Sequence, residues 1–308
     1  MLKEQLRKLA LQEFDLVGFC TPDVEEYIKE AYEKWLSQGY HASMNWMQKN
    51  KEVRKNPDQL LPGVKSVIVV ALSYARTGER ASSGCGKIAR YARSRAYHHV
   101  FRGKMKRFTM QADALFHEKS LSEQIVSACD TKPVFERYFA WKAGLGFIGR
   151  NTMLITSKFG SYVMLGCFLT TAKIEADEAG EGTCGNCTRC LDACPTKALV
   201  GPRILDGSKC LAYWTIEHKG EFPESLSLSG NLFGCDICQE VCPYNKKELA
   251  HKDNELHVVR VPPSLAPEEV LSIRSADEFS IKFAGTPLMR AGYEGMKRNA
   301  RAVKREIG

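Results

Sequence analysis

The residues best suited to chemistry are eight cysteines in two groups in the second half of the chain. The first group reads CGNCTRCLDACP over residues 184–195, and the second comprises Cys210, Cys235, Cys238 and Cys242. A C-x2-C-x2-C-x3-C-P spacing presents three thiolates to one cubane cluster, and in two-cluster ferredoxins the fourth cysteine ligates the other cluster. We therefore predict two [4Fe–4S] clusters in a crossed arrangement. Cluster 1 takes Cys184, Cys187, Cys190 and Cys242; cluster 2 takes Cys194, Cys210, Cys235 and Cys238.

Two other uses of these cysteines remain open at this point. Four-cysteine zinc sites also contain C-x2-C pairs, although they rarely show three cysteines at this spacing before x3-C-P. Disulfides suit short secreted chains, and the N-terminal residues MLKEQLRKLALQEF resemble an amphipathic helix rather than a signal peptide. No apolar run reaches the roughly 18 residues of a membrane span. We therefore expect a cytoplasmic protein that does not enter membranes.

The basic residues are concentrated in two stretches. The net charge is +8, and residues 80–112 hold nine Lys or Arg without any Asp or Glu, while residues 297–305 hold five more. Such stretches suit a phosphate-rich partner, although a solvated helix face would look the same.

The elements that must position these residues form an α+β chain. Residues 1–50 are predicted to be mostly helical, most clearly over 25–38, and residues 97–108 and 133–143 also favour helices. The segments VKSVIVVAL at 64–72 and YVMLGCFLTT at 162–171 indicate buried strands. Residues 39–51, which include Trp46, form either a pocket-lining loop or part of the core. The G-x-G-x-x-G at 144–149 follows a predicted helix rather than a strand, so we do not expect a Rossmann site.

Several segments together resemble epoxyqueuosine reductases. They are ARYARSRAYHHV, DTKPVFERYFAWKAGLGFIGRNTMLI, CGNCTRCLDACPTKAL, LAYWTIEHKG, GCDICQEVCPYN and GTPLMRAGYEGMKRNA, and they span nearly the whole chain. The resemblance implies a nitroreductase-like cobalamin-binding α/β domain at 1–176, a ferredoxin-like two-[4Fe–4S] domain at 177–250 and a C-terminal extension with a basic helix at 251–308. It also implies reduction of the epoxide of epoxyqueuosine to the alkene of queuosine at the wobble position of tRNA, with base-off cobalamin.

The resemblance further implies roles for individual residues. Asp130 would be the proton donor, although Asp-Thr-Lys-Pro could equally cap the helix that follows. Cobalamin would be held by Arg54, Gly146, Asn151, Thr152, Leu154, Thr156, Tyr162 and Leu165. The tRNA would be contacted by Arg93, Arg95, Tyr97, His98, Tyr213, Trp214, Thr215, Glu217, Lys297 and Arg298.

The chain departs from the family in two respects. Many members carry a helical-repeat domain after the cluster domain, whereas this chain ends at Gly308, and Ser94 and Ala96 replace the glycine and acidic residue of a G-R-D-Y-H segment. We expect a monomer that receives electrons from an external one-electron donor such as a flavodoxin or ferredoxin. The alternative function is that of a reductive dehalogenase-like enzyme acting on a small organic substrate.

Overall fold

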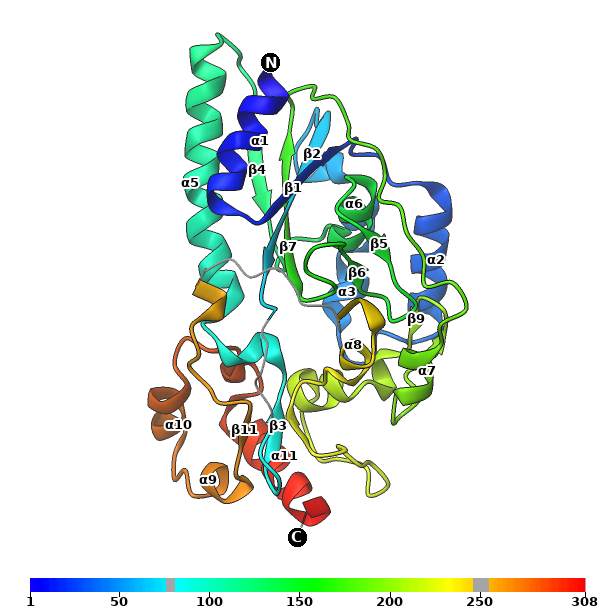
Figure 1. Cartoon of the computed structure of the whole chain (residues 1–308), viewed down its shortest axis with the longest axis vertical. Coiled ribbons are helices and arrows are strands. Elements are labelled where there is room, and N and C mark those ends of the chain that lie inside the picture. The colour runs from blue at the N-terminus through cyan, green and yellow to red at the C-terminus, as the bar shows by residue number, and fades with distance from the viewer. Residues whose placement is uncertain (76–80, 246–254, 308) are drawn as a thin grey trace.

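The computed structural model describes residues 1–75, 81–245 and 255–307, and these ranges are meant wherever the described residues are mentioned. Arg80 and the boundary expected between residues 250 and 251 lie outside them. Figure 1 shows the N-terminus and the C-terminal helices near opposite ends of the long axis of the molecule. Among the described residues, no helix is long and apolar enough to cross a membrane.

A four-stranded antiparallel sheet in the order β1-β2-β7-β4 organises the N-terminal half. Its strands are β1 (Leu16–Cys20), β2 (Ser66–Ser73), β7 (Val163–Thr170) and β4 (Ile125–Ala128). Every residue of β2 is buried, because alternate side chains enter the two cores on opposite faces of the sheet. This explains the unbroken apolar run that predicted the strand.

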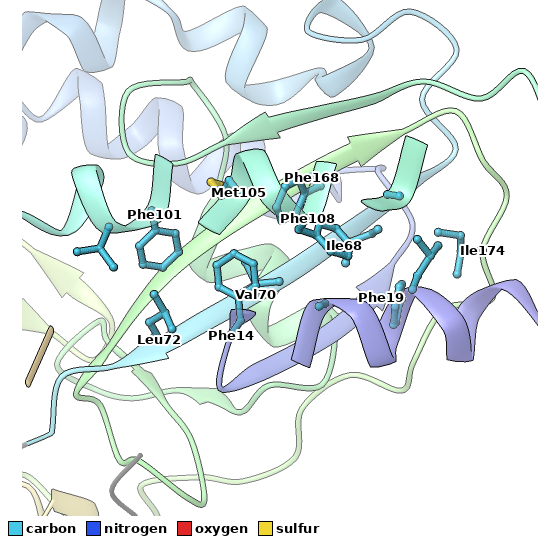
Figure 2. Packing of buried hydrophobic residues seen from close by; sticks show 14 of the residues in the cluster. Phe14, Phe19, Ile68, Val70, Leu72, Phe101, Met105, Phe108, Phe168 and Ile174 are labelled. Atoms are coloured by element: carbon cyan, nitrogen blue, oxygen red, sulfur yellow. The ribbon is translucent and has the colours of Figure 1, made fainter. Parts of the chain in front are cut away.

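Two helices cover one face of this sheet, namely α1 (Leu2–Glu13) and α5 (Tyr97–Glu118). Figure 2 shows Phe101, Met105 and Phe108 of α5 above Ile68, Val70 and Leu72 of β2. The rings of Phe108 and Phe168 meet edge to face at 4.7 Å, an arrangement that aromatic pairs prefer. The helix therefore holds its N-terminal turn, which carries Tyr97 and His98, in a fixed place at one end of the sheet.

Helix α6 (Glu136–Lys142) covers the other face through Tyr138, Phe139 and Ala140. The prediction of a mostly helical N-terminal segment missed β1, which pairs along its whole length with β2. Gly18 of β1 permits the close approach of this layer, since a Cβ atom there would lie 2.0 Å from the carbonyl oxygen of Ala143.

A second sheet joins three distant segments of the chain. Strand β3 (Gly86–Ile88) lies between β10 (Asn231–Phe233), which is parallel to it, and β11 (Ser264–Leu265), which is antiparallel. One hydrophobic core unites residues 88–92, the region around β10 and the C-terminal helices. The three domains expected from the sequence thus share a sheet and a core here.

The remaining elements are short. The structure contains two hairpins, β5 (Phe147–Ile148) with β6 (Leu154–Ile155) and β8 (Leu199–Gly201) with β9 (Ile204–Leu205). The other α-helices are α2 (Glu26–Ser37), α3 (Asn45–Lys49), α4 (Lys51–Lys55), α7 (Arg189–Ala193), α8 (Ile237–Glu240), α9 (Pro267–Leu271), α10 (Ala276–Phe283) and α11 (Gly292–Ile307). A π-helix spans Tyr213–Glu217, and 3₁₀ turns span Pro57–Gln59, Arg90–Arg93, Gly207–Lys209, Pro243–Asn245, Glu255–His257 and Pro287–Arg290.

Candidate active site

Four cysteines from two distant segments line one cavity of about 290 Å³. They are the predicted ligands of cluster 1, Cys184, Cys187, Cys190 and Cys242. The β5–β6 hairpin packs against them through Phe147 and Ile155. The backbone N–H of Arg150 donates to the Cys184 sulfur at 3.4 Å, and hydrogen bonds to cluster sulfurs are one way in which proteins tune reduction potentials.

The other four predicted ligands also lie near one another. Burial raises the pKa of the Cys235 thiol to about 12, and the neighbouring Cys210, Asp236 and Cys194 add to this effect. Burial also raises the pKa of the Cys238 thiol, and the neighbouring Cys235, Cys210 and Asp236 add to this effect. Thiols this reluctant to ionise require a cationic partner to become thiolates, as a metal cluster would provide.

The cysteines are not paired with one another in this structure. All twelve cysteines are free, and nowhere in the described ranges do three His, Cys, Asp or Glu side chains converge tightly enough to hold one metal ion. A cubane cluster spaces its four thiolates further apart than a tetrahedral zinc ion does. The grouping of the cysteines into two sets of four is the one that the spacing predicts for two clusters.

A larger cavity of about 1080 Å³ lies at the end of the central sheet, beside α5. Its walls come from α3 and α4, the first half of α5, the loop after β4, the π-helix and the turn at 286–290. The cavity is lined by five cationic side chains, which are Arg54, Arg102, Lys106, Lys132 and Arg290. Only two carboxylates line it, those of Asp130 and Glu217. Such a surface attracts an anionic ligand.

Asp130 lies on the wall of this cavity in the loop that joins β4 to α6. It adopts a left-handed backbone conformation with φ 55°, which Asp tolerates better than most residues. Its backbone N–H donates to Glu136 Oε1 at 3.2 Å. The N-cap of α6 is Phe135 rather than Asp130, so the capping alternative for Asp130 is wrong and its carboxylate is left for other contacts.

Three side chains interact electrostatically with the Asp130 carboxylate. Burial raises the pKa of the Tyr97 hydroxyl, and the charge of Asp130 is the second largest cause of the increase. The hydroxyl therefore stays protonated. Burial lowers the pKa of His98 although Asp130 opposes this, which favours the neutral imidazole. The hydrogen bond to Glu217 raises the pKa of the Arg290 guanidinium, and the charge of Asp130 raises it further. A carboxyl among such donors can exchange a proton with a bound ligand.

Comparison with known proteins identifies the family. A curated epoxyqueuosine reductase from Gloeobacter violaceus is 39% identical over 311 residues, covering 98% of this chain and 94% of the relative. The chain belongs to the epoxyqueuosine reductase family. Another epoxyqueuosine reductase, from Cellulophaga algicola, is 34% identical and covers 98% of this chain and 99% of its own length. These relatives confirm the resemblance drawn from the sequence, and the chain is accordingly an oxidoreductase.

Two family models match separate parts of this chain. Residues 54–131 match "Epoxyqueuosine reductase QueG, DUF1730", and residues 183–245 match "4Fe-4S double cluster binding domain". The second match covers all eight cysteines and confirms the prediction of two [4Fe–4S] clusters. Which cysteine serves which cluster remains a prediction.

Solved structures of epoxyqueuosine reductases share the fold. One, bound to a tRNA-Tyr stem loop modified with epoxyqueuosine, has a TM-score of 0.87 at 32% identity and covers 99% of this chain and 81% of that one. Another, from Bacillus subtilis, has its catalytic loop swung out of the active site; its TM-score is 0.85 at 31% identity, with 99% and 81% coverage. The prediction of a mixed α/β part followed by a cluster region is thereby confirmed.

Of the eight residues expected to hold cobalamin, Arg54 lines the large cavity. Its guanidinium donates to the Val134 carbonyl at 2.7 Å, and within the described residues its Nε atom is buried without a hydrogen-bond partner. Asn151 lines the cluster 1 cavity instead, and its amide donates to the Cys238 carbonyl. The other six line neither cavity: Gly146, Thr152, Leu154 and Thr156 surround the β5–β6 hairpin, and Tyr162 and Leu165 lie at or in β7.

The residues expected to contact tRNA divide into three groups. Tyr97, His98 and Glu217 line the large cavity, and Tyr213 lines a neighbouring one. Three others have partners within the chain. Arg95 forms an ion pair with Glu255, the Trp214 ring contacts the His218 ring, and Lys297 donates to the Ile273 carbonyl. Arg93, Thr215 and Arg298 are 4%, 0% and 8% exposed, which argues against direct contact with tRNA.

The buried arginines have structural roles. Arg298 donates to the carbonyls of His218, Gly220 and Trp214, and thereby fixes the segment around the π-helix to α11. Arg93 donates from Nε to the Ile88 carbonyl at 2.9 Å. Sequence reasoning missed Arg290 and Glu136 as site residues, since no local spacing connects either of them to Asp130. The sequence places Trp46 in a segment that either lines a pocket or belongs to the core, and in the structure Trp46 lines the large cavity.

Proposed function

We propose that this protein reduces epoxyqueuosine to queuosine in tRNA. The observation that carries the proposal is the position of the Asp130 carboxylate on the wall of a cationic cavity of about 1080 Å³, in a chain with two cluster-binding sets of cysteines. The cavity can take an anionic polynucleotide at its mouth and a single modified base inside. Two curated relatives that each cover 98% of this chain are named epoxyqueuosine reductases, which supports the proposal.

We further propose that the large cavity holds cobalamin. The cavity is larger than an ordinary small-ligand site, and among the described residues Arg54 Nε and His98 Nδ1 are buried there without hydrogen-bond partners. Such donors and acceptors fit the amide-rich rim of a corrin. When bound, cobalamin would supply a strongly reducing, nucleophilic metal centre, and the two clusters would deliver electrons to it one at a time.

The side chains of this protein would supply the proton and the orientation. Opening an epoxide to an alkene consumes two electrons and two protons and releases the oxygen as water. Asp130, in its protonated form, would give one proton to that oxygen, while the Tyr97 hydroxyl would orient its carboxyl group. Arg290 and Lys106 would hold the phosphates on either side of the target nucleotide.

The protein would act as a monomer in the cytoplasm, where its tRNA substrate and a flavodoxin or ferredoxin are available. The test is direct: anaerobically reconstituted protein with a chemical reductant should convert an epoxyqueuosine-containing stem loop to the queuosine form, seen by mass spectrometry as the loss of one oxygen atom. Protein reconstituted with clusters but without cobalamin is the control. An unchanged stem loop with the fully loaded protein would refute the proposal.

A further inference from the structure

A second cavity, of about 530 Å³, adjoins the active-site cavity. Three rings line it, those of Trp46, Tyr213 and His218, together with the cations Lys219 and Arg290. Trp46, Glu217 and Arg290 line both cavities. The two spaces therefore share a wall.

Trp46 is the exposed ring of this second cavity. It extends from α3, and 43% of it is exposed. The Arg290 guanidinium lies over its ring, 5.4 Å from the centroid, which is a cation–π contact. Arg290 is in turn held by both carboxylate oxygens of Glu217, with Nε–Oε1 at 3.0 Å and Nη2–Oε2 at 2.8 Å.

The inner side of the cavity is also fixed. The Tyr213 hydroxyl shares a hydrogen bond of 2.8 Å with Ser43 Oγ, and the Tyr213 and His218 rings meet edge to face at 5.9 Å. The Lys219 ammonium reaches the carbonyls of Arg290 and Ala291. Rings and cations are thus preorganised beside the site, and the carboxylate in the lining, that of Glu217, is already neutralised by Arg290.

We propose that this second cavity binds a nucleobase next to the target nucleotide in the anticodon loop, stacked on Trp46, with Arg290 and Lys219 facing the phosphate that links the two nucleotides. The inference rests on the proposed function. Proteins recognise single-stranded RNA by stacking splayed bases on aromatic or arginine planes beside cationic groups. The shared wall between the cavities places consecutive nucleotides of one strand in consecutive sites.

The test is a double-perturbation cycle on stem-loop binding, read by fluorescence anisotropy. Trp46→Ala should weaken binding about 10-fold, the scale of one base–aromatic stack, and Trp46→Phe should restore most of it. With the wild-type protein, a stem loop that lacks the base on one side of the target should lose a similar amount of binding affinity. With Trp46→Ala, removal of the same base should weaken binding little further. Tyr27→Ala is the matched control, since Tyr27 is a 53% exposed ring on α2.

Quenching of tryptophan fluorescence by the stem loop gives a second readout, which should fall in Trp46→Phe. The subsite does not exist if Trp46→Ala binds the stem loop as tightly as the wild type does. The subsite also does not exist if the loss of affinity in Trp46→Ala adds fully to the loss caused by the missing base, whichever side of the target that base is on. Failure of the proposed function would look different, because the wild-type protein itself would then leave the epoxide of the stem loop unreduced.

Discussion

The carboxylate of Asp130 is the group on which the chemistry depends most directly. Asn keeps its shape and tolerates the left-handed backbone at φ 55°, whereas Ala would add backbone strain there. We predict that Asp130→Asn folds, keeps both clusters and loses about 100-fold or more in turnover, as expected when a general acid is removed. Single-turnover alkene formation by the chemically reduced protein measures this. A rate near that of the wild type would show that the proton comes from elsewhere.

Glu136 is the side chain that holds Asp130 in place, through the 3.2 Å hydrogen bond from the Asp130 backbone N–H. Burial raises the pKa of this carboxyl. We predict that Glu136→Ala lowers turnover about 10-fold, which matches the loss of one hydrogen bond, and speeds amide hydrogen exchange over residues 129–133. Glu136→Gln keeps an acceptor oxygen and should retain most activity. Unchanged exchange in Glu136→Ala would contradict a positioning role.

The short elements around the cysteines lead to a prediction about pairs of variants. If the clusters are crossed, Cys184→Ala and Cys242→Ala should abolish the same electron paramagnetic resonance signal, and Cys194→Ala and Cys235→Ala the other. Iron should fall from about eight to about four per chain in each case. Cys85→Ala, at a free cysteine outside both sets, should keep all the iron. Loss of one signal by both Cys184→Ala and Cys194→Ala would favour uncrossed clusters.

Elements with a local signature could be predicted from the sequence, and those defined by distant contacts could not. The apolar runs of β2 and β7 are visible because both faces of these strands are buried. Strand β1 has five residues, too few to show a clear alternation, and it follows directly on helix α1. Cysteine spacing is likewise local, whereas the meeting of Asp130 with Arg290 requires the tertiary fold.

Arginine burial explains the main errors among the predicted tRNA contacts. Charged residues are almost always at the surface unless they are paired, so Arg93 and Arg298 were expected there. Arg298 instead finds three backbone carbonyls supplied by the segment 214–220, which are more than 70 residues away in sequence. The residues next to Arg298 in the sequence therefore do not reveal which groups accept its hydrogen bonds.

At the scale of the whole molecule, the exposed cations of α11 extend the basic surface beyond the cavities. Arg301, Lys304 and Arg305 are exposed, and Lys304 forms an ion pair with Glu268 at 3.0 Å. We predict that changing the three to Ala weakens tRNA binding and lowers the slope of log K against log salt, by about 0.7–0.9 for each phosphate that the variant no longer neutralises. A matched triple change of Lys8, Lys29 and Lys34 is the control. Equal slopes for the two triples would contradict a specific role for α11.

The sheet formed by β10, β3 and β11 has a consequence for the synthesis of the protein. Strand β3, near residue 87, pairs with partners near residues 231 and 264. At ribosomal rates of about 5–20 residues per second, β3 is made about 9–35 s before β11, so the edge that β11 covers stays unpaired for that time even after β10 has been made. The last strand is thus synthesised after all eight cysteines, so the core that it completes closes only once every predicted cluster ligand has been made.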